Sequence, residues 1–348
     1  MLNYLFPDGR LTTTGKDVWQ KLSAQKKREI YQWMTLLRYV DKKCIALQRR
    51  GRIGTYVSLA GQEAAQVGSA LALRSKDWVF PTYRDHGAAY IAGVPLYQIL
   101  LYWMGRVEGN RYPKGLRVLP PSVPIATHLP HAVGVAWAAK LKNEDSVAIA
   151  FFGDGATSEG DFHEACNFAG VFQVPIVFFC QNNGYAISVP FSRQSATKTV
   201  VEKAKGYSIE GIRLDGNDVL VVYDTIQKYL NREKSRRKPI LVEAVTYRLN
   251  GHTTADDPKK YRTETEENVW RKRDPLLRYA TLLRNENLWS DQDEQEWMQH
   301  CEEEFQKALK TIEEMESPAK QHLYAHVYVE RKNGGILYES DDHGGSDS

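Results

Sequence analysis

Long apolar runs and a basic leader are both missing from this sequence of 348 residues. No segment reaches the ~18 uninterrupted apolar residues of a membrane helix. The first fifteen residues do not join a basic region to an apolar one, so they do not read as a secretory signal. We therefore expect no membrane association and predict a cytoplasmic protein. A location in the mitochondrial matrix would require that a presequence had been removed.

Cysteine is scarce, and no charge sign dominates. Cys44, Cys166, Cys180 and Cys301 show no paired spacing, which argues against a disulfide framework and a zinc site and favours buried free thiols. Lys and Arg number 46 against 43 for Asp and Glu, a net charge of +3. This near balance gives no support for nucleic-acid binding.

Strand-like and helix-like segments alternate along most of the chain. Short buried runs such as 147–152, 175–180 and 239–249 are separated by helical segments, which is typical of an α/β fold with a doubly wound, mostly parallel sheet. We predict an extended N-terminal arm over 1–24 and a domain over 25–330. This domain begins with a helix at 26–50 and has a helical extension from about 274. The polar, glycine-rich end, 331–348, predicts disorder.

The most informative segment is 146–189. A buried strand leads into Gly153-Asp154-Gly155, a helix follows from about Asp161, and a second buried strand ends in Asn182-Asn183. Asn183 follows Asp154 by 29 residues, and both lie at the carboxyl end of a strand, where such folds bind ligands. A carboxylate with an amide oxygen suits Mg²⁺ bridging to phosphates. We expect the glycines to let the backbone approach an anion, and the helix N-terminus to favour phosphate.

A Gly-Asp-Gly followed about thirty residues later by Asn-Asn resembles the thiamine-diphosphate signature. From about Arg38 to Tyr328 the chain is similar to the alpha subunits of the decarboxylating component of 2-oxoacid dehydrogenase complexes, so it resembles the thiamine-diphosphate-binding fold. The resemblance implies thiamine diphosphate and Mg²⁺ as cofactors. It implies that Asp154, Asn183 and the carbonyl of Tyr185 bind Mg²⁺, and that Gly155 and Ala156 lie along the diphosphate.

Other cofactor contacts are implied in the same way. The pair Tyr83-Arg84 would bind the diphosphate; without the resemblance, a surface Arg capping a turn is the plainer interpretation. Val123 and Ile125 would lie against the cofactor. In branched-chain relatives the matching loop binds K⁺. The resemblance implies that the corresponding K⁺ ligands in this chain are Ser122, Pro124 and Thr127.

Two histidines are candidate catalytic residues. His252 follows a buried strand and could shuttle protons or donate to an oxyanion, or simply cap the strand end. The resemblance implies a role for it in acyl transfer to a lipoyl group. His128 stands where branched-chain relatives carry Gln, and imidazole is a poor K⁺ ligand. It could line the substrate entrance or pack under the loop.

Three nearby side chains receive weaker interpretations. Glu159 and Asp161 are assigned to the helix N-terminus, where carboxylates are stabilised. The resemblance also places Thr253 where animal relatives carry a phosphorylated Ser, which leaves regulation by a kinase as an open alternative.

The resemblance also implies partners. The glutamate that activates the cofactor belongs to a beta subunit in the resembled family, so we expect an α₂β₂ heterotetramer and a lipoylated acyltransferase core. The expected reaction is oxidative decarboxylation of a 2-oxoacid, with pyruvate favoured. Branched-chain 2-oxoacids such as 3-methyl-2-oxobutanoate come next, then acetoin. A transketolase-like transferase and a non-catalytic scaffold remain as alternatives from other classes.

Overall fold

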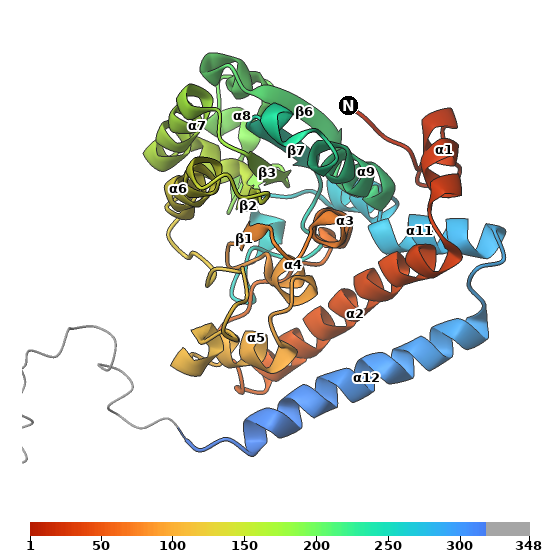
Figure 1. Ribbon diagram of the computed structural model, residues 1–348. Coiled ribbons are helices and arrows are strands. Elements are labelled where there is room, and N and C mark those ends of the chain that lie inside the picture. The colour runs from red at the N-terminus through yellow and green to blue at the C-terminus, as the bar shows by residue number, and fades with distance from the viewer. Residues whose placement is uncertain (318–348) are drawn as a thin grey trace, which may run out of the picture. The chain divides into compact units, whose positions relative to one another are not determined.

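A five-stranded parallel sheet forms the centre of the computed structural model, which describes residues 1–317 (Figure 1). The strand order is β1-β2-β3-β7-β6, and every neighbouring pair is parallel. The sheet strands are β1 (Trp78–Phe80), β2 (Ala148–Gly153), β3 (Ile176–Asn182), β6 (Glu210–Asp215) and β7 (Ile240–Val245). Two short strands, β4 (Tyr185–Ala186) and β5 (Val189–Pro190), form a separate antiparallel hairpin.

Helices connect the strands and lie on both faces of the sheet, with α6 and α7 on one side and α3 and α9 on the other (Figure 1). The helices are α1 (Thr13–Lys21), α2 (Ala24–Arg49), α3 (Glu63–Ala72), α4 (His86–Ile91), α5 (Leu96–Trp103), α6 (His128–Leu141), α7 (Gly160–Phe172), α8 (Phe191–Gln194), α9 (Val219–Leu230), α10 (Glu264–Arg271), α11 (Pro275–Asn285) and α12 (Asp291–Glu313). This arrangement confirms the predicted doubly wound α/β class. None of the helices in residues 1–317 combines the length and apolarity needed to span a bilayer.

Alternation along the central strands builds the core. Ala148, Ala150 and Phe152 of β2 face the helix pair α6 and α7, together with alternate residues of β3. Small residues of α6 and α7 allow these helices to lie close to the strands. Both β2 and β3 are buried along nearly their whole length, as expected for strands covered on both faces. The rigid strand pair therefore fixes the positions of the two loops that follow it.

The N-terminal segment differs from the prediction of an extended arm. It contains α1, which begins at the N-cap Thr12, whose hydroxyl accepts a hydrogen bond from the backbone of Gly15. Gly15 interrupts the helical pattern, but a side chain there would collide with the Tyr4 carbonyl. Residues 13–21 of the predicted arm are therefore helical. The close packing that requires glycine at position 15 involves Tyr4 and is not visible in the sequence pattern.

The long helix predicted at 26–50 is present as α2, and the predicted C-terminal helical extension is present as α11 and α12. Ser290 opens α12 with a reciprocal capping box to Asp293. Residues 1–314 form one compact unit. The boundary predicted at residue 330 and the disorder predicted for 331–348 lie outside the described residues.

Candidate active site

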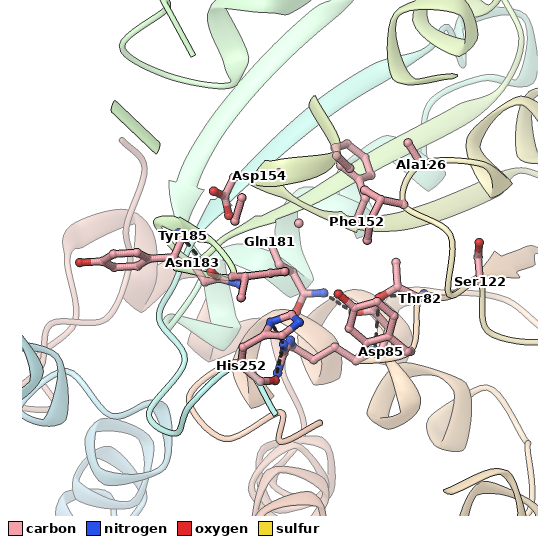
Figure 2. Close-up of a pocket in the computed structure, with 18 of the residues that line it drawn as sticks. Thr82, Asp85, Ser122, Ala126, Phe152, Asp154, Gln181, Asn183, Tyr185 and His252 are labelled. Atoms are coloured by element: carbon pink, nitrogen blue, oxygen red, sulfur yellow. Dashed lines mark hydrogen bonds between the residues drawn. The ribbon is translucent and has the colours of Figure 1, made fainter. Parts of the chain in front are cut away.

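A cleft of about 270 Å³ opens at the carboxyl ends of β1, β2 and β3. Loops from separate parts of the chain form its walls, including the loop before α6 and the segment after β7. Figure 2 shows labelled side chains from these loops converging on the cleft. The predicted site residues that line it are Tyr83, Arg84, Ser122, Pro124, Ile125, Asp154, Gly155, Ala156, Asn183, Tyr185 and His252. The structure thus brings most of the predicted set together.

Asp154 is fully buried at the end of β2. Its Oδ2 accepts a hydrogen bond of 2.7 Å from Nε2 of Gln194, whereas its Oδ1 has no hydrogen-bond partner among the described residues. Burial raises the pKa of this carboxyl to about 6, although the nearby charge of Arg248 and the hydrogen bond from Gln194 lower it in part. A buried carboxylate with an unused oxygen is costly unless a cation binds it.

Asn183 lies beside Asp154 because β2 and β3 are neighbouring parallel strands with Gly153 opposite Gln181. The Asn183 amide donates to Oε1 of Gln62 at 3.2 Å, and its Oδ1 accepts from the backbone of Tyr185 at 3.3 Å. Asn182 instead points away and donates to Glu243 at 2.8 Å. The strand alternation therefore assigns the second asparagine to the cleft and the first to the interior.

A chain of amides and a carboxylate fixes the floor of the cleft. Gln62 donates to Gln181 at 3.0 Å, and Gln181 donates to Asp85, which also accepts from the backbone of Thr82 at 2.8 Å. Burial raises the pKa of Asp85, partly offset by these hydrogen bonds. These hydrogen bonds link Asn183 to the loop that carries Tyr83 and Arg84. The predicted ligands therefore sit on a connected, buried support.

The oxygens near Asp154 fit a hard divalent cation. Asp154 Oδ1 has no partner in the described part of the chain, and Asn183 adds a second side-chain oxygen in the same cleft, with Tyr185 following it. Nowhere in residues 1–317 do three His, Cys, Asp or Glu side chains gather as a metal site. A cation here would therefore depend on one carboxylate, an amide oxygen and a backbone carbonyl, as Mg²⁺ sites completed by phosphate oxygens do.

The glycines around Asp154 have different functions. A side chain at Gly153 would meet no atom within 4 Å, so this residue leaves the cleft open to a ligand. A Cβ at Gly155 would lie 2.9 Å from Cβ of Ala186, so Gly155 is needed chiefly for packing against β4. Gly184 has a φ of +85°, which the turn between β3 and β4 requires. Packing against Ala186 is thus a second reason for glycine at position 155, and the approach of an anion there stays a prediction.

Arg84 is buried at the edge of the cleft, which it helps to line. Its guanidinium donates to the Ser58 carbonyl and to the carbonyl of His252 at 3.0 Å, and burial lowers its pKa. Tyr83, the other half of the predicted pair, packs edge-on to the His252 ring at 6.2 Å between centroids. Both residues line the cleft, so they remain available to an anion there.

His252 occupies the wall formed by the segment after β7. Its Nδ1 lies 3.1 Å from Arg84 Nη2 and 2.8 Å from Arg248 Nη1. Burial and the two guanidinium charges lower its pKa to about 4. The backbone N–H of His252 donates to Asp256 at 2.6 Å, which holds the segment in place. His252 is therefore neutral near pH 7 and lies in the cleft.

Oxygen atoms of the three residues in the predicted K⁺ site are hydrogen-bonded to one another. The Ser122 hydroxyl lies 2.9 Å from the Pro124 carbonyl and 3.0 Å from the Thr127 hydroxyl, and Thr127 donates to the same carbonyl at 3.2 Å. Three oxygens are thus grouped in the loop before α6. Their occupancy by K⁺ stays a prediction.

Three of the predicted residues do not line the cleft, namely Val123, Thr127 and His128. His128 is buried at the start of α6, with Nε2 2.7 Å from the Phe151 carbonyl, so it matches the alternative of packing beneath the loop. Burial lowers its pKa. Val123 points outward, with 57% of its surface exposed. We therefore leave His128 out of the catalytic set that we propose.

Glu159 and Asp161 lie at the start of α7 as predicted. Glu159 also lines the cleft, which the sequence interpretation did not include. Thr253 accepts a hydrogen bond at 3.2 Å from the backbone of Ala255 in a local turn. Its phosphorylation stays a prediction.

Sequence reasoning missed several supporting residues, namely Gln62, Asp85, Gln181, Gln194 and Arg248. Two of them had a local signal. Asp85 directly follows the Tyr83-Arg84 pair, and Gln181 directly precedes the two asparagines. Gln62, the N-cap of α3, and Gln194, the last residue of α8, are distant in sequence from Asn183 and Asp154, and only the folded chain places them together.

Comparison with known proteins agrees with this geometry. Residues 31–321 match the family described as "Dehydrogenase E1 component". The chain is 46% identical over 290 residues to the 3-methyl-2-oxobutanoate dehydrogenase subunit alpha of Mycobacterium tuberculosis, covering 83% of this chain and 79% of the relative. It is 38% identical over 314 residues to the pyruvate dehydrogenase E1 component subunit alpha of Staphylococcus aureus, covering 90% and 85%. The corresponding protein of Bacillus cereus is 41% identical over 290 residues, covering 83% and 78%. The chain therefore belongs to the dehydrogenase E1 component family, as an alpha subunit of the thiamine-dependent 2-oxoacid dehydrogenases.

Proposed function

We propose that this chain is the diphosphate-binding subunit of a cytoplasmic enzyme that oxidatively decarboxylates pyruvate and passes the acyl group to a lipoyl arm. One observation carries the proposal. Asp154 has a buried oxygen that no residue of 1–317 contacts by a hydrogen bond, beside Asn183 in a cleft that also contains Arg84 and His252. This combination is what an Mg²⁺-bound diphosphate requires.

Different residues of the cleft would bind the metal and the phosphate groups. Asp154, Asn183 and the Tyr185 carbonyl would hold Mg²⁺, and Tyr83 and Arg84 would bind phosphate oxygens. The other cleft residues in contact with the cofactor would be Gly155, Ala156 and Ile125.

When bound, thiamine diphosphate supplies the electron sink for decarboxylation. The buried support under Asn183 keeps the metal ligands in place, because each amide in it is hydrogen-bonded. Preorganisation of this kind lowers the reorganisation needed when charge develops.

A partner subunit is part of the proposal. Ile125 and Ile187 flank the cleft with 43% and 56% of their surfaces exposed, and Val123 is exposed nearby. Apolar side chains gathered at the mouth of a site indicate a surface that another protein covers. We propose that a beta subunit covers it, supplies the activating glutamate and completes an α₂β₂ heterotetramer, which then docks a lipoylated acyltransferase core.

We also propose K⁺ binding by the oxygens of Ser122, Pro124 and Thr127. Their mutual hydrogen bonds, all near 3 Å, give a small oxygen cluster in the loop beside the cleft. Cofactor binding measured in potassium and in a bulky ammonium salt at equal ionic strength tests this. Equal affinity in both would argue against it.

Substrate choice is tested on the reconstituted assembly. The relative that is 46% identical is named for 3-methyl-2-oxobutanoate, so this branched acid is the second candidate substrate. Pyruvate, for which other relatives are named, remains the first. Steady-state kcat/KM for pyruvate, 3-methyl-2-oxobutanoate and acetoin, with a lipoyl domain as acceptor, separates these substrates. A clear preference for the branched acid would refute the pyruvate assignment. Transfer to a sugar acceptor instead would favour a transketolase-like enzyme, and failure to bind cofactor would favour a scaffold.

A further inference from the structure

A buried carboxylate on β7 is connected to the two turns that carry the predicted metal ligands. Glu243 is fully buried and pairs in register with Cys180 of β3 on one side and Arg213 of β6 on the other. Its Oε1 accepts a hydrogen bond of 2.8 Å from Nδ2 of Asn182, and its Oε2 accepts one of 3.0 Å from the backbone N–H of Val201. The Arg213 guanidinium lies 3.4 Å from Oε1. Each of these neighbours presents a donor, so both oxygens of Glu243 act as acceptors.

The first connection runs to the turn that follows β3. While Nδ2 of Asn182 donates to Glu243, Oδ1 of the same side chain accepts from the backbone N–H of Gly184 at 3.0 Å. Asn183 stands between these two bonded residues. The hydrogen bond from Gly184 closes the turn around Asn183, as asparagine side chains commonly do. The direction of the Asn183 side chain therefore depends on how Asn182 is held.

The second connection runs to the turn that follows β2. Val201 is the first residue of a short 3₁₀ segment, η3 (Val201–Tyr207). In this segment, Nζ of Lys203 donates to the carbonyl and to the hydroxyl of Thr157 at 2.7 and 2.8 Å. The Thr157 hydroxyl donates in turn to the Asp154 carbonyl at 2.8 Å. By binding Val201, Glu243 thus fixes the start of the segment that holds the Asp154 turn.

We propose that Glu243 is a positioning residue that holds Asp154 and Asn183 in place for one shared divalent cation. The inference rests on the proposed function for the identity of these two residues as metal ligands. Parallel pairing of β2 with β3 brings the two strand ends together, but each ligand lies one residue beyond its strand. Backbone pairing does not fix the turns, so a buried side chain connected to both of them determines how the ligands are presented.

The amide of glutamine cannot replace this carboxylate, because one of its two terminal atoms only donates. If the Gln oxygen faces Asn182, the Gln nitrogen faces the Val201 N–H, which is left without an acceptor. If the Gln oxygen faces Val201, Asn182 has to turn its own oxygen towards the Gln nitrogen, and Gly184 then loses its acceptor. Glu243→Gln should therefore free one of two backbone N–H groups, that of Val201 or that of Gly184.

A second substitution reverses the polarity of the pair and should restore the bonds. In Glu243→Gln combined with Asn182→Asp, the Gln nitrogen donates to one Asp oxygen, and the Gln oxygen accepts from Val201. The other Asp oxygen accepts from Gly184. The three hydrogen bonds return while the total charge of the pair is unchanged, so the double variant should recover what Glu243→Gln loses.

Amide hydrogen exchange in the ligand-free full chain, followed by NMR, measures both N–H groups without the cofactor. Rates are taken relative to the amide of Phe178 in the middle of β3, which corrects for any general loss of stability. We expect Val201 or Gly184 to exchange about tenfold faster in Glu243→Gln, the effect of one lost hydrogen bond, and to regain the wild-type rate in the double variant. Unchanged relative rates of both amides in Glu243→Gln, or no recovery in the double variant, would overturn the proposal.

Calorimetric titration of Mg²⁺ and thiamine diphosphate into the reconstituted assembly tests the positioning itself. We expect the affinity to fall about tenfold in Glu243→Gln and to recover in the double variant. Wild-type affinity in Glu243→Gln, together with faster amide exchange, would show that the hydrogen bonds do not position the ligands, and would overturn the proposal. Absence of binding in the wild type would refute the proposed function instead, and the exchange rates would still decide whether Glu243 holds the two turns.

Lys203→Met tests the connection to Asp154 without changing the buried carboxylate. The two hydrogen bonds to Thr157 are lost, so the affinity for Mg²⁺ and thiamine diphosphate should fall about tenfold. The exchange rate of Gly184 should stay the same, because Gly184 belongs to the other connection. Lys205→Met, at an exposed position of the same segment, is the matched control and should change neither quantity. Wild-type affinity in Lys203→Met would refute the connection to Asp154 and with it the proposal.

Discussion

Replacing Asp154 by asparagine should stabilise the ligand-free chain above about pH 6 while removing its affinity for Mg²⁺. Burial raises the pKa of this carboxyl from 3.8 to about 6. The folded state therefore disfavours the ionised carboxylate. The contribution of this group to the free energy of unfolding is complete below its pKa in the unfolded chain, and it is lost as the pH rises through about 6. The full shift corresponds to about 3 kcal/mol.

The amide does not recover all of this free energy. Its oxygen can accept from Gln194, but its nitrogen then occupies the position of Oδ1, which has no partner within residues 1–317. A buried unsatisfied donor costs about 1–3 kcal/mol, so the net gain at neutral pH is about 1 kcal/mol. The pH dependence is the sharper prediction, because the amide penalty does not titrate.

Urea unfolding of the ligand-free full chain at several pH values measures the effect. The free energy of unfolding of Asp154→Asn, relative to that of the wild type, should rise by about 1.4 kcal/mol between about pH 5 and about pH 8. The reason is that only the wild type has a carboxyl at position 154 that ionises over this range. Asp17→Asn, at an exposed position of α1, is the matched control for the exchange of a carboxyl for an amide. A stability difference that is flat with pH, or that falls as pH rises, would refute the reasoning on Asp154.

Four further substitutions probe the same region. Gln194→Leu removes the donor that holds Asp154 Oδ2, and should weaken Mg²⁺-dependent cofactor binding about tenfold by calorimetry; unchanged affinity would exclude a positioning role. Gly155→Ala brings a methyl group within 2.9 Å of Ala186, and should cost about 1–3 kcal/mol in urea unfolding, whereas Gly153→Ala meets open space and should cost less. Phe162→Ala empties a buried site against Phe152 under the same loop, and should cost about 3–5 kcal/mol; a loss below about 1 kcal/mol would contradict the packing described.

The sequence was sufficient where the signal is local. The buried strands, the Gly-Asp-Gly turn and the Asn-Asn pair are adjacent in sequence to the structures they form, so the approach of Asp154 to Asn183 could be predicted from parallel strand geometry. The resemblance then supplied Tyr83, Arg84 and the Ser122 loop, all of which lie at the cleft.

The rest depends on contacts between distant segments. Gln62 supports Asn183 across 121 positions of sequence, and Arg84 meets His252 across 168. No periodicity encodes such pairs. His128 shows the reverse case, because the residue next to the predicted K⁺ loop begins α6 and is directed to the Phe151 carbonyl instead of the cleft. Side-chain direction at a helix start could not be predicted from residue type.

The most direct test of the account is a calorimetric titration of thiamine diphosphate into the chain reconstituted with its beta subunit, with and without Mg²⁺. We expect saturable binding that requires Mg²⁺ in the wild type and is lost in both Asp154→Ala and Asn183→Ala. Binding that is indifferent to Mg²⁺, or that survives both substitutions, would contradict the assignment of these two residues as the metal ligands.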